Sequence, residues 1–175
     1  FNTSNEFNAD QTPFLSSPTL IANMDLYSSI SKHSGFFNAW PDNDGYIRRT
    51  NLVMFVNGKP YPSLPLEMAR VILNEDLELT LDQNQRIEQL GFKHSGRHIA
   101  VSPLGTMEIN FRGPSNSFQY VRALEVMKDE NDIQIEKLEK TGNRIIASEK
   151  KSDLLKDAYV LVGLSALGVF DMRAF

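Results

Sequence analysis

The chain has 175 residues, of which 41% are hydrophobic and 23% are charged, and its formal net charge is −4. These proportions are typical of a folded globular domain and exclude a disordered chain, a coiled coil and a collagen-like fibre. No basic stripe is visible, so we expect no nucleic-acid partner, and the lack of cysteine excludes disulfides, thiolate metal sites and cysteine nucleophiles.

The first part of the chain predicts short elements separated by polar turns. Residues 1–18 are rich in Asn, Ser, Thr and Pro, and we expect them to be mobile. Residues 19–24 predict a strand or an extended segment, and residues 25–31 predict a helical turn. Residues 35–40 predict a short aromatic strand, which ends in the turn formers 41–45, where Gly45 can adopt a positive φ.

A strand and a helix follow this turn. Residues 46–56 are β-branched, aromatic and increasingly apolar, which predicts one long strand that stops at the tight-turn pair Asn57-Gly58. The next segment predicts a helix with Ser63 as its N-cap and Pro65 in its first turn. Its expected core-facing stripe consists of Leu64, Met68, Val71 and Ile72.

The second half of the chain alternates strands with helices. Residues 77–81 and 86–92 are compatible with either, while residues 97–101 and 106–111 predict an antiparallel hairpin. A helix over residues 118–127 is predicted next, with Phe118, Val121, Leu124 and Met127 on one face. Residues 128–152 are polar and fit a hairpin of edge strands around a Gly142-Asn143 turn or a solvated helical arm, and we favour the hairpin. Residues 159–162 predict a central, buried strand. We therefore expect an α/β or α+β fold, a mixed β-sheet flanked by helices, in a single domain or a fragment of one.

The turn at residues 41–45 invites a calcium interpretation. If Gly45 is the sixth loop position, the ligand positions 1, 3, 5 and 12 of an EF-hand fall on Trp40, Asp42, Asp44 and Asn51, and the bidentate Glu is absent. We favour the alternative in which Asp42 and Asp44 bond backbone amides and Arg48 or Arg49 neutralises them. We expect no resident metal and no cofactor.

Other motifs that could carry chemistry are incomplete. Residues 163–168 (GLSALG) miss the middle glycine of a dinucleotide fingerprint, and Val169 and Phe170 stand where a phosphate loop needs Lys and Ser or Thr. Leu167 replaces the last glycine of a nucleophile elbow around Ser165. The three histidines, His33, His94 and His98, form no metal-binding motif, and we expect them on the surface or in a hairpin. We expect no catalytic residues, and an enzyme built on the glycine loop ranks last.

Asn110 and Arg112 alternate with apolar residues on the predicted strand 106–111 and beyond it, with Glu108 beside them. They fit a cross-strand hydrogen bond or ion pair that fixes the sheet, or the wall of an anion pocket. We favour the first interpretation, because the polar face of a strand usually meets water.

Three blocks in a fixed order carry a family resemblance: GFFNAWPDNDGYIRR followed by YPSLPLEMAR, then GTMEINFRGP, then DAYVLVGLSALGVFD. Over about 135 residues they resemble the type-2 CHASE domain, an extracytoplasmic sensory module of bacterial membrane receptors. The residues that match the family's motifs are Asn38, Pro41, Asp42, Asp44, Gly45, Arg48, Pro62, Ser63, Leu64, Gly105, Ile109, Asn110, Arg112, Gly113, Gly163, Gly168 and Asp171. The family's usual first half is not visible and residues 128–151 look like an insertion, so the resemblance is to the C-terminal portion.

The resemblance implies one sensory domain over residues 1–175, on the periplasmic or outer face of an inner-membrane protein. It implies flanking membrane helices, a homodimer formed through the parent receptor, and a cytoplasmic output such as a nucleotide cyclase or a histidine kinase. The expected signal is a small molecule or an ion, and the candidate ligand-binding residues are Asp42, Asp44, Arg48, Arg49, Asn110 and Arg112. The alternative is a dimerisation module that binds no small molecule.

Overall fold

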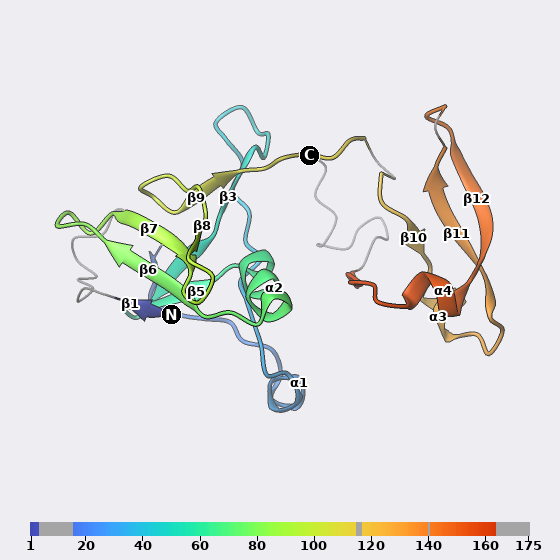
Figure 1. Ribbon diagram of the computed structural model, residues 1–175, viewed down its shortest axis with the longest axis horizontal. Helices are drawn as coiled ribbons and strands as arrows, with labels where there is room; N and C mark the ends of the chain where they lie inside the picture. The colour runs from blue at the N-terminus through green and yellow to red at the C-terminus, as the bar shows by residue number, and fades with distance from the viewer. Residues whose placement is uncertain (4–15, 115–116, 140, 164–175) are drawn as a thin grey trace. The chain divides into compact units, whose positions relative to one another are not determined.

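The computed structural model describes residues 1–3, 16–114, 117–139 and 141–163. The chain forms two compact units, Phe1–Ile109 and Asn110–Ala174, which are described separately (Figure 1). Both units combine short helices with small sheets, and the first has parallel as well as antiparallel strand pairs. The predicted α+β class with mixed strand pairing is therefore confirmed.

The first unit begins with two short strands and a helix. Strand β1 (Asn2–Thr3) pairs in parallel with β6 (Leu77–Leu81), and β2 (Ser16–Ser17) pairs in parallel with β4 (Val53–Val56). Helix α1 (Asp25–Ile30) confirms the predicted helical turn, and none of its residues is buried. Most of residues 1–18, for which mobility is predicted, lie outside the described part. The aromatic strand predicted at residues 35–40 is wrong, because only Phe36 makes a single bridge, to Ser63.

The long strand predicted over residues 46–56 is divided into two. Strand β3 (Arg49–Asn51) pairs with β9 (Thr106–Glu108), whereas β4 (Val53–Val56) pairs with β5 (Lys59–Pro62). Leu52 lies at the division: its N–H donates to the Gly105 carbonyl and its own carbonyl accepts from the Ser63 N–H. At Leu52 the backbone therefore passes from the β3–β9 pairing to the β4–β5 pairing. The turn predicted at Asn57-Gly58 is confirmed, with φ of 49° and 77° at these two residues.

Helix α2 (Leu64–Leu73) begins where the sequence predicts. The Ser63 hydroxyl accepts from the Leu66 N–H and a proline occupies the first turn. The predicted buried stripe is wrong: Leu64, Val71 and Ile72 are each about 40% exposed, and the helix buries Leu66 instead. The core-facing side lies about half a turn from the prediction, because the packing of the sheet decides which side is covered.

The main core of the first unit joins residues of β4 and α2 to the four-stranded sheet β1-β6-β7-β8, in which β6 spans Leu77–Leu81, β7 spans Ile87–Phe92 and β8 spans Arg97–His98. Strand β4 contributes to two cores, because alternate side chains point to opposite faces. Val53 and Phe55 enter the main core, while Met54 and Val56 pack with Phe36 in a smaller cluster. The main core consists of Leu52, Val53, Phe55, Leu66, Leu77, Leu79, Leu81, Ile87, Leu90 and Phe92.

The antiparallel hairpin predicted from residues 97–101 and 106–111 is wrong. Strand β8 pairs with β7, and β9 (Thr106–Glu108) pairs with β3. The connection is nevertheless a tight turn, in which Ser102 accepts from Gly105 and donates to the Thr106 carbonyl through its backbone. A local turn therefore joins two strands that belong to different ladders.

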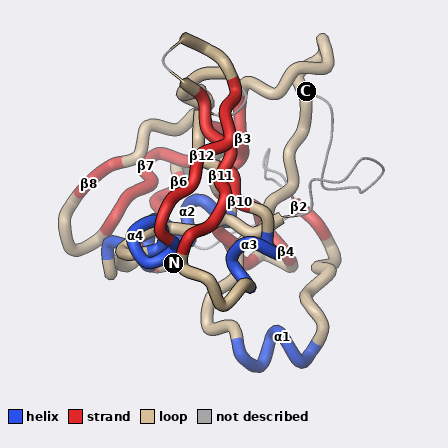
Figure 2. Tube along the Cα trace, turned by 90° about the vertical axis from the view of Figure 1, so that its right-hand side faces the viewer, coloured by secondary structure: helices blue, strands red, loops and turns tan. Residues whose placement is uncertain are grey.

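The second unit is a three-stranded antiparallel sheet of β10 (Tyr120–Val121), β11 (Asp132–Leu138) and β12 (Arg144–Lys150). The hairpin favoured for residues 128–152 is present, and Gly142 in its turn has a φ of 87°. Helices α3 (Ala123–Met127) and α4 (Lys151–Leu155) lie at the end of the hairpin away from its turn (Figures 1 and 2). Ile133 and Ile135 of β11 are buried.

Two predictions in this unit are wrong. The helix predicted over residues 118–127 begins only at Ala123, and Phe118, Leu124 and Met127 are exposed. Residues 159–162, predicted as a buried central strand, form no regular element and are 58% to 91% exposed. No neighbouring strand in the described residues pairs with them, so an apolar composition alone does not bury this segment.

Candidate functional site

Residues 41–49, here called the polar turn, form a loop that ends at the first residue of β3 (Figure 1). Its backbone closes on itself, since the Asp42 N–H donates to the Tyr46 carbonyl at 2.7 Å and the Gly45 N–H donates to the Asp42 carbonyl at 2.8 Å. Gly45 has a φ of 85°, a conformation in which a side chain is strained. The Asp44 carboxylate accepts from the Tyr46 N–H at 3.2 Å.

Two arginines neutralise the two aspartates of the polar turn. Arg48 lies 2.8 Å from an Asp44 oxygen and 3.3 Å from an Asp42 oxygen, and Arg49 lies 2.7 Å from the other Asp42 oxygen. The hydrogen bond from Arg49 is the largest cause that holds the pKa of Asp42 below its ordinary value, and the bond from Arg48 does the same for the pKa of Asp44. The guanidinium of Arg48 also lies over the ring of Tyr46, 5.1 Å from its centroid.

This geometry confirms the favoured interpretation of the turn as a self-paired structure. Asp44 bonds a backbone amide as predicted, whereas Asp42 uses its carboxylate only for the arginines. A calcium ion would have to displace Arg48 and Arg49 from both carboxylates. The arginine side chains are more than half exposed, so the ion pairs are screened by water and exchange with other partners at little cost.

The other two candidate ligand residues, Asn110 and Arg112, belong to the second unit. The strand predicted to carry them ends at Glu108, so they follow β9 as exposed loop residues. The prediction that they lie on the polar face of that strand is therefore wrong. The structure brings together Asp42, Asp44, Arg48 and Arg49 within the first unit.

A second polar cluster, absent from the sequence analysis, lies at α2. Glu67 is buried, and Arg70 contacts it through Nε at 2.8 Å and Nη2 at 2.7 Å. Arg70 is the largest cause that lowers the pKa of Glu67. His33, which we expected on the surface or in a hairpin, is exposed and places its Nδ1 3.1 Å from Glu67 Oε1. The i, i+3 spacing of Glu67 and Arg70 could have indicated their pairing, but nothing local indicates His33.

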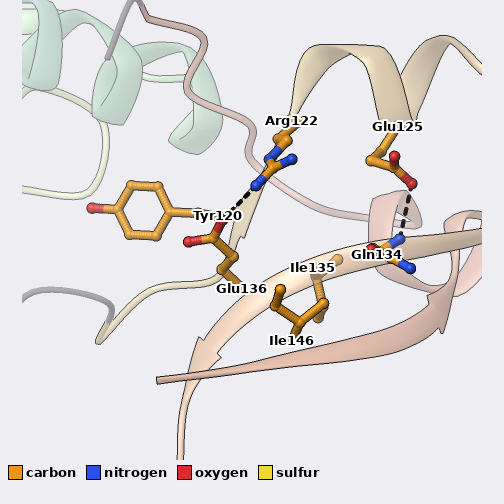
Figure 3. Close-up of a pocket in the computed structure, with 7 residues that line it drawn as sticks. All are labelled: Tyr120, Arg122, Glu125, Gln134, Ile135, Glu136 and Ile146. Atoms are coloured by element: carbon orange, nitrogen blue, oxygen red, sulfur yellow. Dashed lines mark hydrogen bonds and ion pairs between the residues drawn. The ribbon is translucent and has the colours of Figure 1, made fainter. Parts of the chain in front are cut away.

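A shallow pocket of about 20 Å³ lies on the second unit, lined by Tyr120, Arg122, Glu125, Gln134, Ile135, Glu136 and Ile146 (Figure 3). Tyr120, Glu136 and Ile146 are directly opposite one another on β10, β11 and β12. Arg122 points toward Glu136 at 3.5 Å, and Glu125 accepts from the Gln134 N–H (Figure 3). The volume is that of about one water molecule, so the pocket as it stands holds no organic ligand.

The remaining motifs add no site in the described part of the chain. Within it, no group of three or more histidine, aspartate or glutamate residues is arranged to hold a metal ion. The glycine loop and Ser165 lie outside the described residues, apart from exposed Gly163. His94 stands 3.4 Å from Glu75, whose carboxylate also accepts from the N–H groups of His94 and Ser95.

The fold and the site define an α+β protein with a surface turn whose two aspartates and two arginines pair with one another. A family model, described as the CHASE2 domain, matches residues 6–175. The chain therefore belongs to the CHASE2 family, and CHASE2 domains are extracytoplasmic sensory domains without catalytic activity. No curated protein and no solved structure matches the chain. Among the described residues, each helix is too short or too polar to cross a lipid bilayer.

Proposed function

We propose that this chain is the signal-input domain of a bacterial transmembrane receptor, on the outer side of the inner membrane. Flanking membrane helices connect it to a cytoplasmic output such as a nucleotide cyclase or a histidine kinase. The single observation that carries this proposal is the CHASE2 match over residues 6–175. The domain has two arrangements, and a signal that binds one of them more tightly raises the population of that arrangement. The size of the shift is limited by the difference between the signal's affinities for the two arrangements.

The polar turn is the proposed ligand site. Arg48 and Arg49 are more than half exposed, so a ligand reaches them from solvent. Exposed ion pairs are weak, so an anionic group of the ligand can replace Asp42 or Asp44 as the partner of an arginine. The two aspartates and two arginines sum to zero charge. A ligand that carries both an anionic and a cationic group would leave every charge of the turn paired, so zwitterions such as free amino acids fit it best.

Thermal melting of the chain against single anions, single cations and zwitterions tests the ligand site. A ligand at 100 times its dissociation constant adds about 2.7 kcal/mol to the free energy of unfolding, which raises the melting temperature by several degrees. Arg48→Met should abolish the rise, and Arg97→Met, which removes an exposed arginine from β8, should leave it intact. A rise that survives Arg48→Met would place the ligand elsewhere.

The location is tested separately by labelling. The chain has no cysteine, so Thr141→Cys in the exposed hairpin turn creates a single reactive group within it. In the full-length receptor, a membrane-impermeant maleimide added to intact spheroplasts should label this cysteine as fully as after lysis. Labelling only after lysis would place the domain in the cytoplasm and refute the proposal. The unsubstituted receptor measures the background.

A dimerisation module that binds no small molecule is the second candidate, and the exposed apolar side of α2 favours it. Leu64, Val71 and Ile72 are each about 40% exposed there, and a second copy of the chain would cover them. Sedimentation equilibrium should then show a dimer that Ile72→Asp dissociates, while Asn74→Asp, which adds the same charge just beyond the helix, does not. A monomer at high concentration would exclude this candidate.

A further inference from the structure

Residues 33–36, here called the strap, are fastened to the start of α2. The Phe36 N–H donates to the Pro62 carbonyl at 3.1 Å, and the Leu64 N–H donates to the Phe36 carbonyl at 2.7 Å. The Phe36 side chain is buried in the small core cluster. The strap continues directly into the segment that carries the polar turn. The contacts that hold the strap therefore also fix the position of the first residues of that segment.

The first residue of the strap, His33, has one ring nitrogen between two opposed partners. Its Nδ1 lies 3.1 Å from Glu67 Oε1 and 3.0 Å from Arg70 Nη2. A guanidinium only donates and a carboxylate only accepts. A neutral Nδ1 with a free lone pair therefore accepts from Arg70, whereas an Nδ1 that carries a proton donates to Glu67. Both contacts cannot be hydrogen bonds at the same time.

The cluster of His33, Glu67 and Arg70 combines a histidine with two groups that are ordinarily charged at neutral pH. In the part of the chain that the structure describes, the charged groups that face it are Glu67 and Arg70, both from α2, and Lys32 precedes it in sequence. Arg70 lowers the pKa of Glu67 and so keeps it ionised, and the negative charge of Asp76 raises the pKa of Arg70. Histidine is the side chain that ordinarily titrates between pH 5 and 8.

We propose that His33, Glu67 and Arg70 form a proton-operated latch, in which His33 changes its partner from Arg70 to Glu67 when it binds a proton. The proton comes from solvent and forms an N–H bond at Nδ1, and no other covalent bond forms or breaks. Arg70 retains its Nε bond to Glu67 Oε2 and its Nη2 bond to Glu67 Oε1, while Nη2 no longer donates to the now positive ring. The latch is a property of the chain itself and does not depend on the proposed receptor function.

The two states differ in how firmly the strap is held. In the neutral state the strap accepts a bond from the Arg70 guanidinium, in which only the donor is charged. In the protonated state it donates to the Glu67 carboxylate, and the attraction between two opposite charges adds to that bond. His33 is 47% exposed, so water screens part of the gain. Acidification therefore tightens the strap against α2 and steadies the segment that leads to the polar turn.

Nuclear magnetic resonance of the ¹⁵N-labelled chain tests the latch without any substitution. At pH 8 the Nδ1 of His33 should show the shift of an unprotonated acceptor, and at pH 5.5 it should carry a proton that is bonded to a carboxylate. Hydrogen exchange of the Leu64 amide, corrected for its intrinsic pH dependence, should slow about threefold over the same range, in line with a bond between two opposite charges replacing a bond with one charged partner. A proton on Nδ1 at both pH values, or at neither, would overturn the proposal.

Variants separate the latch from a general effect of pH. His33→Gln assigns the ring signals and should remove the pH dependence of exchange at Leu64, because an amide does not titrate in this range. His98→Gln is the matched control, since His98 is an exposed histidine of β8, and it should retain the full response. An equal response in the chain with His33→Gln would show that other groups fasten the strap, and would overturn the role of His33.

Discussion

Gly35→Ala is the substitution that tests most directly how closely the strap approaches α2. A Cβ at position 35 would lie 2.6 Å from Leu64 Cα and from Leu64 N, and 2.8 Å from the Ser63 carbonyl carbon. These are backbone atoms at the start of a helix, so they cannot rotate away as a side-chain end can. The φ of Gly35 is not in the left-handed region, so an alanine there carries the steric conflict without backbone strain.

The magnitude follows from two opposed effects. Forcing an extra methyl group into a filled space costs about 1–3 kcal/mol, and replacing glycine by alanine recovers about 0.4–1 kcal/mol by restricting the unfolded chain. The net loss in the free energy of unfolding is therefore about 1–2 kcal/mol. Gly163→Ala is the matched control, because it has the same chemistry with nothing within 4 Å of the new Cβ, and it should be neutral or slightly stabilising.

Urea unfolding followed by tryptophan fluorescence is the assay. Trp40 is the single tryptophan of the chain, and it lies in the first unit, shortly after Gly35. With a denaturant slope of about 2 kcal/mol/M, the midpoint for Gly35→Ala should fall by about 0.5–1 M. Equal midpoints for Gly35→Ala and the unsubstituted chain would refute the close approach of the strap.

Three further predictions concern the cap, the core and the polar turn. Ser63→Ala removes the N-cap of α2 and should lower the free energy of unfolding by about 1 kcal/mol, and no change in urea midpoint would argue against the cap. Leu79→Ala, at a side chain of 0% exposure, should lower it by about 2–5 kcal/mol. Ile146→Ala, at 64% exposure, should change it by less than about 0.5 kcal/mol, and comparable losses at both sites would contradict the burial. The pKa values of Asp42 and Asp44 are lowered on folding, so their stabilisation is present above the ordinary value of 3.8 and is lost as the pH falls through the lowered values. Asp42→Asn should therefore flatten the acid limb of the melting temperature below about pH 4, and unchanged acid limbs would exclude this contribution.

The features that could be predicted from the sequence are those whose causes are local. Ser63 caps a helix because its hydroxyl reaches an N–H three residues on, whatever lies around it. Asn57 and Gly58 form a tight turn because they tolerate a positive φ. The hairpin around Gly142 follows from the same kind of short-range preference.

The features that were predicted wrongly depend on distant partners. Nothing local marks Leu52 as the residue at which one ladder replaces another, because its two hydrogen bonds go to Gly105 and Ser63. The apolar pattern of α2 offers more than one possible stripe, and the sheet selects Leu66. Residues 159–162 have the composition of a central strand, yet a strand also needs a neighbour to accept its hydrogen bonds.

The candidate site shows the same division. The pairing of Asp44 with Arg48 spans four residues and could be predicted from their proximity in the sequence. The contact of His33 with Glu67 spans 34 residues and depends on the path of the strap over α2. Composition and spacing alone would not place a histidine against a buried glutamate at that distance.

The pairing of β3 with β9 also has a kinetic consequence. These strands meet only after the whole chain from Leu52 to Gly105 has been drawn into a closed loop, whereas β11 and β12 are joined by a single turn. Hairpin formation takes about 1–10 μs, and contacts that close long loops form more slowly. When the complete chain refolds from denaturant, the second unit therefore contains the faster step. During synthesis the first unit emerges seconds earlier, so translation gives its slower long-range pairing a head start.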